Sequence, residues 1–394
     1  MSYLLRHGAE KEGLHMREDG YIYLNDLLEM KSLKSKRIGQ AEIEYIVATN
    51  DKQRFELSEE QGVMLIRASQ GHTIKTVKTE ELLDRIKNPF EYNQIIHGTY
   101  REPLPLIMQH GLNRMARNHM HLAIGMPGNG VISGMRTSCE IVVDINMTKA
   151  MHGQHKIPFH ISSNKVVLTE GLEDGSLPAK YFRWVLDFQA KRYLHQAPFD
   201  YICIFDFECT CTNDESVKLN AQEVIEFPVV LLNVKTRQIK SIFHTYVKPT
   251  EDPQLTDFCT ELTGITQDQV DAGVDITVAM KQLHVWLGQQ GVFGSEFIFM
   301  SCGDFDGNHL GREAKRKQFF VPNYLRRWIN LKKAFPQSRV DASKPDYDFN
   351  DFYTIKNCKP TVRGMTDMLE LLELELEGRH HSGIDDCKNL TRVV

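Results

Sequence analysis

The chain has 394 residues, of which 41% are hydrophobic and 25% are charged, and its formal net charge is −5 at pH 7. This length and composition are typical of a globular protein with two or three domains. No apolar run approaches the roughly 18 residues of a membrane span, and the first residues lack the apolar centre of a signal peptide. We therefore expect no membrane association and a cytoplasmic or nuclear location.

The eight cysteines include no Cys-x-x-Cys pair. This spacing argues against a structural zinc site and predicts reduced thiols. The slightly negative net charge gives no global signature of nucleic-acid binding, but a polyanion can still bind in a locally basic site. Composition therefore leaves the function open, and the polar motifs must decide it.

The first half predicts two small lobes. A helix that Gly8 ends, a helix over 41–47, and a hairpin of 55–57 with 63–67 around an acidic turn indicate a winged-helix-like lobe over 1–85. The apolar segments 140–145 and 165–168 predict strands of a second lobe over 86–188.

A mixed polar segment with a proline, residues 189–200, predicts the domain boundary, because a buried strand over 201–205 follows it directly. The third domain then spans 198–394. It is predicted to contain strands over 227–233, 241–247 and 297–300, and helices over 276–287, 365–376 and 385–393. The expected fold class is a multidomain mixture of α/β and α+β structure, with an α/β sheet that has an antiparallel hairpin at one side of the last domain.

The second half carries a set of acidic residues that suits metal binding. Asp206 and Glu208 are two residues apart at the end of a predicted strand, so both side chains emerge on one face. Carboxylates brought together repel one another unless cations neutralise them. Two divalent ions, Mg²⁺ or Mn²⁺, can activate water and stabilise the leaving oxygen of a phosphodiester. The predicted metal ligands are Asp206, Glu208, Asp304 and Asp386, and His381 is the predicted general base.

These residues, in this order, resemble the DEDDh family of 3′→5′ exonucleases, and most of all its Eri-type RNA exonucleases. The motifs that carry the resemblance are Asp206-Phe-Glu-Cys-Thr-Cys211, Glu226-Phe-Pro228, Leu262-Thr-Gly-Ile-Thr-Gln267, Gly303-Asp-Phe-Asp306, Gly364-Met-Thr-Asp-Met368 and Gly378-Arg-His-His-Ser-Gly-Ile-Asp-Asp386. The resemblance implies an RNase H-like fold, divalent metal ions, and hydrolysis of RNA from its 3′ end.

The first half lacks such a carboxylate cluster and carries arginine and histidine motifs instead. Converging arginines suit a substrate with several phosphates, because guanidinium matches phosphate oxygens bidentately and stays protonated. Taken singly, an arginine or histidine in such a motif is more often a surface arginine or a hydrogen-bonded core histidine. The motifs are Leu4-Leu-Arg-His-Gly8, Asp19-Gly-Tyr21, Lys52-Gln-Arg-Phe55, Gln70-Gly-His-Thr73, His97-Gly-Thr99 and Val131-Ile-Ser-Gly-Met-Arg136.

In this order the motifs resemble the KptA-type RNA 2′-phosphotransferases. The resemblance implies a winged-helix-like lobe packed on an ADP-ribosyltransferase-like lobe, and transfer of an internal RNA 2′-phosphate to NAD⁺. It also implies the products nicotinamide and ADP-ribose 1″,2″-cyclic phosphate. Carried over by motif, the catalytic residues are Arg6, His7, Arg67 and Arg136, and the NAD-binding residues are His72, Thr73, His97, Gly98 and Thr99.

The two resemblances together predict a bifunctional RNA-processing enzyme that acts on 2′-phosphorylated spliced tRNA and on RNA 3′ ends. One alternative is that only one half is active and the other is retained for RNA binding. Another is that the first half attaches ADP-ribose to nucleic-acid ends. The sequence leaves open the physiological RNA, protein partners, the oligomeric state, and the choice between Mg²⁺ and Mn²⁺.

Overall fold

The structure is a computed structural model that describes residues 1–126, 138–335 and 362–394. The chain divides into two compact units, Met1–Ala197 and Pro198–Val394. None of the helices in the described ranges is long and apolar enough to cross a membrane. Arg136, one of the four residues expected to act in the transferase, lies outside the described residues.

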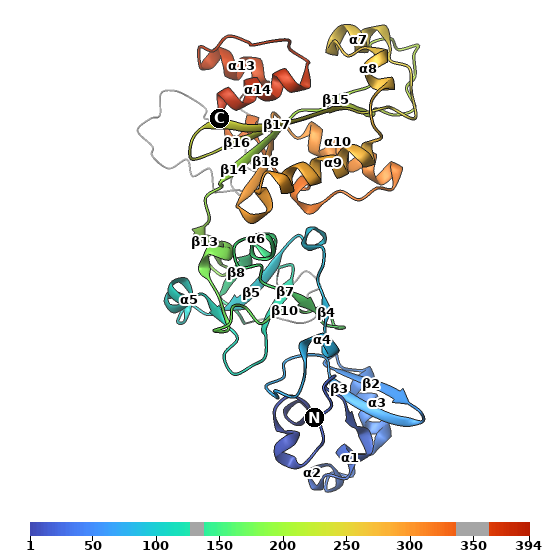
Figure 1. Ribbon diagram of the computed structural model, residues 1–394, viewed down its shortest axis with the longest axis vertical. Coiled ribbons are helices and arrows are strands. Elements are labelled where there is room, and N and C mark those ends of the chain that lie inside the picture. The colour runs from blue at the N-terminus through green and yellow to red at the C-terminus, as the bar shows by residue number, and fades with distance from the viewer. Residues whose placement is uncertain (127–137, 336–361) are drawn as a thin grey trace. The chain divides into compact units, whose positions relative to one another are not determined.

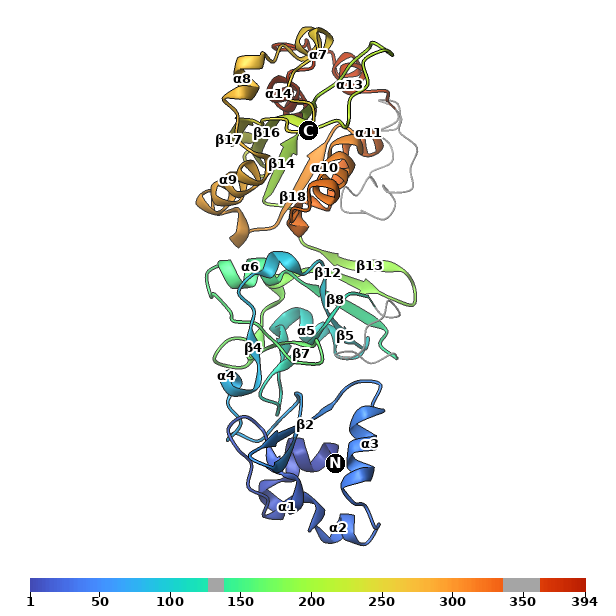
Figure 2. The same ribbon diagram turned by 90° about the vertical axis from the view of Figure 1, so that its right-hand side faces the viewer.

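The first part of unit 1 is a small helical lobe with a three-stranded sheet of order β1-β3-β2. The hairpin turns at Gln61 and Gly62, both of which have positive φ, and the helices lie beside it (Figure 2). The predicted helix over 41–47 and the predicted hairpin are therefore confirmed. The elements are β1 (Ile22–Tyr23), α1 (Leu24–Leu28), α2 (Lys31–Lys34), α3 (Gln40–Ala48), β2 (Phe55–Glu60) and β3 (Val63–Ala68), after the helical turns Leu4–Gly8 and Glu10–Glu12.

The rest of unit 1 is built on an eight-stranded sheet of order β13-β12-β8-β5-β7-β10-β9-β4, whose neighbouring strands are antiparallel. Its strands are β4 (Asp84–Arg85), β5 (Ile95–Thr99), β7 (Met120–Ile124), β8 (Ile141–Ile145), β9 (His160–Ile161), β10 (Val167–Thr169), β12 (Phe182–Asp187) and β13 (Arg192–Gln196). Around it lie α4 (Thr79–Leu82), α5 (Leu104–His110), α6 (Met147–His152), the paired strands β6 (Leu112–Asn113) and β11 (Ser176–Leu177), and the turns Pro89–Glu91 and Ala179–Tyr181.

The segment expected to be a boundary is partly a strand. β13 lies within residues 189–200 and pairs with β12, so it belongs to the sheet of unit 1. Polar composition hid this strand, because an edge strand at the rim of a sheet can carry polar side chains. The two parts of unit 1 also share apolar packing, since Val166 and Leu168 belong to the same buried cluster as Leu5 and Ile22.

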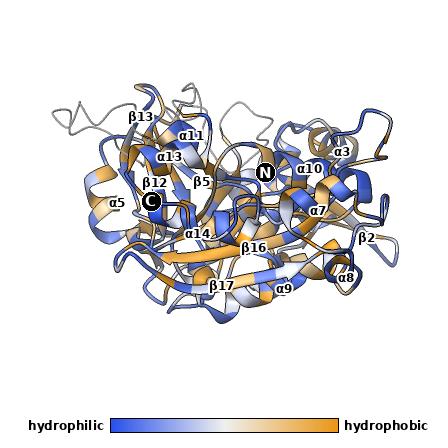
Figure 3. Cartoon of the chain, turned by 90° about the horizontal axis from the view of Figure 1, so that it is seen from above, coloured by the Kyte–Doolittle hydropathy of each residue, from blue (hydrophilic) through white to orange (hydrophobic). Residues whose placement is uncertain are grey.

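Unit 2 contains a mixed sheet in which β17, β16, β14, β18 and β19 are neighbours in that order, while β15 pairs with β16 beyond the end of β14. β14 runs parallel to β18 and antiparallel to β16, and β16 and β17 form the predicted antiparallel hairpin. β16 is apolar along most of its length (Figure 3), as its burial on both faces requires. The strands are β14 (Tyr201–Phe205), β15 (Glu208–Cys209), β16 (Val224–Asn233), β17 (Gln238–Tyr246), β18 (Phe297–Ser301) and β19 (Trp328–Asn330).

Helices cover both faces of this sheet (Figure 1). On one face α13 and α14 pack against Ile204, Val230 and Met300, and on the other lie α9 and α10. The helix expected over 365–376 ends earlier, at Leu371. The arrangement is an α/β fold with an antiparallel hairpin at one side of the sheet, as the sequence predicts. The helices are α7 (Asp257–Thr263), α8 (Gln267–Asp271), α9 (Ile276–Gln289), α10 (Phe305–Lys317), α11 (Leu331–Ala334), α13 (Met365–Leu371) and α14 (Gly383–Val393), with turns at Val292–Gly294 and Asn323–Leu325.

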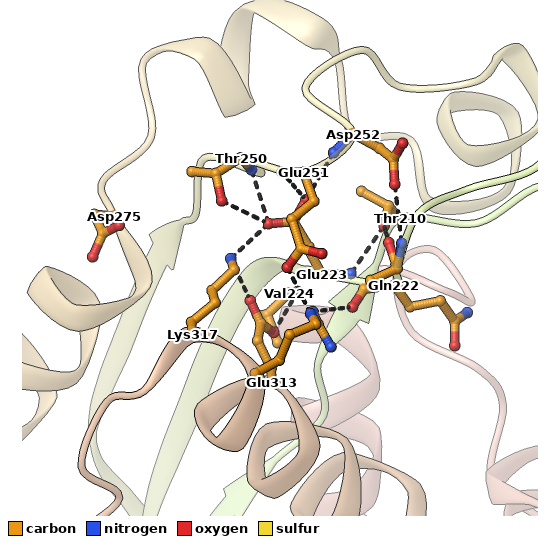
Figure 4. A network of polar contacts seen from close by, with 12 residues as sticks. Thr210, Gln222, Glu223, Val224, Thr250, Glu251, Asp252, Asp275, Glu313 and Lys317 are labelled. Atoms are coloured by element: carbon orange, nitrogen blue, oxygen red, sulfur yellow. Dashed lines mark hydrogen bonds and ion pairs between the residues drawn. The ribbon is translucent and has the colours of Figure 1, made fainter.

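A buried polar network fixes α10 to the start of β16 (Figure 4). Glu223, which is fully buried, accepts hydrogen bonds from the backbone amides of Thr250, Glu251 and Asp252 and pairs with Lys317 of α10 at 2.6 Å. Despite its burial, these donors lower the pKa of the Glu223 carboxyl to about 2. The network holds the C-terminal end of α10. The first turn of the same helix faces an acidic cluster.

Candidate functional sites

Three of the four expected metal ligands meet at one point in unit 2. Asp206 follows β14 directly, Glu208 begins β15, and Asp386 lies in the first turn of α14. Ligand oxygens from these three side chains all lie within 4.8 Å of one another. That spacing allows one cation to contact all three carboxylates.

The fourth expected ligand, Asp304, does not join them. Its carboxylate pairs with Lys333 at 2.7 Å and accepts a hydrogen bond from the indole of Trp328 at 3.2 Å. Asp306 lies next to the cluster instead: it is 4% exposed, and its Oδ1 accepts a hydrogen bond at 3.0 Å from the backbone amide of Phe207, the residue between Asp206 and Glu208 in the chain. Asp304 stands at the N-cap position of α10, and two helical residues turn a side chain by about 200°, so these two aspartates point in different directions.

Burial and mutual repulsion raise the pKa of the acidic residues in this cluster. Burial raises the pKa of Asp206, and among the neighbouring charges Asp306 contributes most. The pKa of Glu208 rises to about 9, through burial and then the charges of Glu226, Asp386 and Asp306. Burial also raises the pKa of Asp306 to about 6 and that of Asp386 above its usual value. Proton-binding carboxylates packed this closely have the character of a cation site.

The donor set fits hard divalent cations, which prefer carboxylate oxygen. Among the residues that the structure describes, the ion pair found in this cluster joins His380 to Asp386. The negative charge of the cluster is therefore largely uncompensated by the protein itself. Residues 206, 208, 306 and 386 fit the two metal ions that the sequence predicts.

Two histidines stand next to Asp386. His380 Nδ1 lies 3.1 Å from Asp386 Oδ2, while His381 donates its backbone amide to the same oxygen at 3.1 Å. The two rings stack with centroids 4.0 Å apart. His381 has a φ of 64°, and its side chain is exposed. The expected general base thus lies beside the cluster with its ring free to approach a water molecule.

Sequence reasoning missed Asp306 and His380. Both belong to motifs that carry the resemblance, Gly303-Asp-Phe-Asp306 and Gly378-Arg-His-His. In each motif an identical residue stands one or two positions away, and the sequence does not show which of the two faces the site. Only the apolar neighbours of Asp306 in a helical pattern could have indicated that it faces inward.

In unit 1 the expected transferase residues gather around the loop Ser69–Thr73. The backbone amide of Thr73 donates to the carbonyl of Arg6 at 2.9 Å, and His7 Nδ1 lies 3.1 Å from the Thr73 hydroxyl. Gly71 has a φ of 90°, and a β-carbon there would lie 3.5 Å from Arg6 Cδ and 3.4 Å from His121 Nε2. The loop therefore joins the helical turn of Arg6 and His7 to strand β7.

Several buried nitrogen atoms in this region have no protein partner. They are Nε and Nη2 of Arg6, both ring nitrogens of His72, and Nε2 of His121. Burial, followed by the charge of Arg6, lowers the pKa of His72 to about 3, and burial with Arg117 lowers the pKa of His121 to about 3. Buried polar groups are normally hydrogen-bonded, so such atoms indicate a place for an oxygen-rich ligand. An anionic group fits them, because Arg6 offers donors and no acceptor.

The third expected catalytic residue, Arg67, is held by three groups. Its guanidinium pairs with Glu56 at 2.7 Å, donates to the Asp19 carbonyl at 3.1 Å, and stacks 4.5 Å from the ring centroid of Tyr21. Glu56 in turn accepts the hydroxyl of Ser163, from the other part of unit 1. The charge of Arg67 also lowers the pKa of His72, after the larger effects of burial and nearer charges, which places Arg67 at the same region.

The remaining expected NAD-binding residues lie on β5. His97 Nδ1 is 3.1 Å from the carbonyl of His121, which connects this strand to the unpaired histidine. Gly98 and Thr99 follow along the strand, where they pair with Val142 and Ile141 of β8. Sequence reasoning did not assign Arg117, whose Nη1 lies 3.5 Å from His121 Nδ1.

Comparison with known proteins separates the same two halves. Residues 1–171 match the family model described as RNA 2′-phosphotransferase, Tpt1 / KptA family, and residues 203–394 match the family model described as Exonuclease. The tRNA 2′-phosphotransferase 1 of Danio rerio is 44% identical over 186 residues, which are 46% of this chain and 80% of that protein.

The second half is similar to other proteins. ERI1 exoribonuclease 3 of Homo sapiens is 38% identical over 199 residues, which are 50% of this chain and 53% of that protein. A solved structure of the nuclease domain of 3′hExo, a DEDDh family member bound to rAMP, is 34% identical with a TM-score of 0.41, over 50% of this chain and 92% of that one. The chain spans about half the length of several curated relatives, including 48% of one from Schizosaccharomyces pombe.

These matches define a chain in which a phosphotransferase half precedes an exonuclease half. Through its first half, the chain belongs to the Tpt1/KptA family of RNA 2′-phosphotransferases. Its second half is homologous to the ERI1 exoribonucleases.

Proposed function

We propose that this chain is a bifunctional RNA-processing enzyme. One activity transfers an internal RNA 2′-phosphate, such as that of a tRNA splice junction, to NAD⁺, and the other hydrolyses RNA from its 3′ end with divalent metal ions. The observation that carries the first activity is the set of buried, unpartnered nitrogens of Arg6, His72 and His121. The observation that carries the second is the meeting of Asp206, Glu208 and Asp386 within 4.8 Å.

In the transferase, the 2′-phosphate displaces nicotinamide from NAD⁺, and ribose O2″ then attacks the same phosphorus. The products are a 2′-OH RNA, nicotinamide and ADP-ribose 1″,2″-cyclic phosphate. Arg6, Arg67 and Arg136 bind the phosphate oxygens, where guanidinium stabilises negative charge as it develops. His7 moves the proton of the second step, and its hydrogen bond to Thr73 orients the ring. His72, Thr73, His97, Gly98 and Thr99 bind NAD⁺.

In the exonuclease, Asp206, Glu208, Asp306 and Asp386 hold two ions, Mg²⁺ or Mn²⁺. When bound, the ions supply a nucleophile and stabilise charge on the leaving oxygen. His381 accepts the proton of the attacking water, since its ring is exposed beside Asp386. Asp306 replaces Asp304 in this set, because Asp304 is already paired with Lys333.

We propose that the first lobe, over 1–85, is winged-helix-like and that the second, over 86–188, is ADP-ribosyltransferase-like. The exonuclease domain then occupies 198–394. Support for the first lobe comes from α1, α2 and α3 packed beside the β2–β3 hairpin, and support for the second from its antiparallel sheet. RNA is the partner of both sites, and we propose a cytoplasmic or nuclear location.

An RNA that reports on both activities tests this proposal. The substrate carries an internal 2′-phosphate and a 3′ label, and NAD⁺ and Mg²⁺ are added separately and together. We expect NAD⁺ alone to convert the 2′-phosphate to 2′-OH, and Mg²⁺ alone to release the label. One inactive half that still binds RNA would support the alternative of a retained binding module. ADP-ribose found on RNA or DNA ends would support the alternative of end modification.

A further inference from the structure

Glu226 lies beside the carboxylate cluster without belonging to its ligand group. It stands on β16, directly opposite Glu208 in the β15–β16 register. Its side chain is 2% exposed, an uncommon setting for a glutamate.

The carboxylate of Glu226 binds the N-terminus of α14. Oε2 accepts the backbone amide of Gly383 at 2.9 Å, and Oε1 accepts that of Ile384 at 3.3 Å. The first amides of a helix have no partner within the helix, and the N-cap residue Ser382 provides no side-chain hydrogen bond here. Glu226 therefore caps α14 from a different element of the fold, and a negative charge is favoured at that end of a helix.

A second contact orients the carboxylate from the opposite side. His244 of β17 places its Nε2 2.7 Å from Glu226 Oε1. Both oxygens of Glu226 are thus engaged with nitrogen donors from β17 and α14. This use of its oxygens separates Glu226 from Asp206 and Glu208, which face the cluster.

The start of α14 also approaches the cluster through Gly383. A β-carbon at this position would lie 2.5 Å from the Asp206 carbonyl and 3.1 Å from Glu226 Oε2. Only glycine allows α14 to pack directly on the backbone of Asp206. Asp386 follows three residues later on the same helix, so the position of Gly383 sets the separation of Asp386 from Asp206.

We propose that Glu226 is a positioning residue of the exonuclease site, which sets the placement of Asp386 and His381 against Asp206 and Glu208 by capping α14 from β16, with His244 orienting it. This inference rests on the proposed exonuclease function. Glu226 contacts neither substrate nor metal in this role. It acts through α14, as residues that orient metal ligands generally do.

The competing explanation is that Glu226 merely stabilises the fold. Glu223 offers a matched control, because it directly precedes the same strand, is also buried, and also accepts backbone amides, those of Thr250, Glu251 and Asp252. Its contacts reach a loop and Lys317 rather than α14, and Lys317 keeps Glu313 as a partner if Glu223 is neutralised. A purely structural role predicts the same behaviour for both glutamates.

The experiment compares Glu226→Gln and Glu223→Gln in the full chain. Glutamine keeps the shape of the side chain but turns one acceptor into a donor that opposes the Gly383 amide or His244. We expect Glu226→Gln to lower kcat for 3′ trimming about 10–100-fold, with KM changed less than about threefold, and to weaken Mg²⁺ affinity in calorimetry by about tenfold. Glu223→Gln should lower Tm while keeping kcat and Mg²⁺ affinity at wild-type values.

A second variant changes the packing of α14 on Asp206 directly. Gly383→Ala should reproduce the kcat and Mg²⁺ effects of Glu226→Gln, since its new methyl group displaces the start of α14 from Asp206. The inference is overturned if Glu226→Gln loses thermal stability as Glu223→Gln does but keeps wild-type kcat and Mg²⁺ affinity. Failure of the proposed exonuclease function is a separate result: it is seen in the wild-type chain as the absence of metal-dependent trimming.

Discussion

The carboxylate of Asp306 accepts a hydrogen bond from the backbone amide of Phe207 at 3.0 Å. This contact holds Asp306 against the residue between Asp206 and Glu208 in the chain, and among neighbouring charges Asp306 raises the pKa of Asp206 most. Asp304, two residues earlier, instead holds Lys333 and Trp328.

The first prediction follows from this contrast. Asp306→Asn should lower 3′ trimming at least about 100-fold and weaken Mg²⁺ binding, because the cluster loses a charged oxygen ligand. Asp304→Asn should keep trimming within about threefold and lower stability by about 0–1 kcal/mol, since its ion pair is partly exposed. Rates on 3′-labelled RNA and calorimetric titration of Mg²⁺ measure both effects. The reverse ranking of the two variants would restore Asp304 to the metal site.

The second prediction concerns His381. His381→Ala should lower the hydrolysis rate about 10²–10⁴-fold and leave metal affinity nearly unchanged, as for a general base that does not bind the metal. Its exposed side chain and its backbone contact to Asp386 place it beside the metal site, and because His380, His381 and Asp386 could together hold an ion, metal affinity is the deciding measurement. Single-turnover rates and calorimetry on the same variant separate the two quantities. Loss of metal binding in His381→Ala would make this histidine a ligand.

The third prediction is that chelation separates the two activities. The site of unit 2 is built from carboxylates, whereas the site of unit 1 presents unpartnered arginine and histidine nitrogens. EDTA should abolish 3′ trimming while NAD⁺-dependent loss of the 2′-phosphate continues, because only the trimming reaction needs a divalent cation. Thin-layer analysis of both products from one RNA measures this. Loss of both activities on chelation would contradict the assignment of unit 1.

The fourth prediction concerns Arg6, whose buried Nε and Nη2 have no protein partner. Arg6→Lys should lower the rate of phosphate transfer about 10²–10³-fold, since an ammonium cannot reproduce the bidentate contact of a guanidinium. Arg17→Lys is the matched control, because Arg17 is paired on the surface with Asp19 and Glu60. Time courses that resolve substrate, phospho-ADP-ribosylated RNA and 2′-OH product measure the effect. Equal rates for the two variants would remove Arg6 from the catalytic set.

The fifth prediction is a pH dependence of stability in unit 2. The folded pKa of Glu223 is about 2, below its usual value of 4.5, because Lys317 and three backbone amides favour the charged form. Its contribution is therefore complete above pH 4.5 and is lost as the pH falls toward 2. Glu223→Gln should lower the free energy of unfolding by about 1–3 kcal/mol at pH 7. Denaturant titrations should show this difference shrinking between pH 4.5 and 2, and a constant difference would contradict the assignment.

The sequence by itself determined most of the strands and helices that carry the site of unit 2. β14 and β18 were predicted from their apolar runs and α9 from its helical periodicity, and the polar motifs after β14 and at the start of α14 indicated Asp206, Glu208 and Asp386. These inferences worked because periodicity and the residue types at element ends are local properties of a chain. The strand β13 escaped prediction, because its polar composition resembles that of a linker.

Only the tertiary structure decided between Asp304 and Asp306, since both begin the same helix and differ only in the direction that they face. It also brought Glu226 to the N-terminus of α14, where its partner Gly383 lies 157 residues further along the chain. No local pattern marks such a contact, because the capped helix and the capping carboxylate become neighbours only when the sheet is assembled. The sequence therefore determined which chemical groups the site contains, and the packing of α10 and α14 on the sheet decided which of them meet.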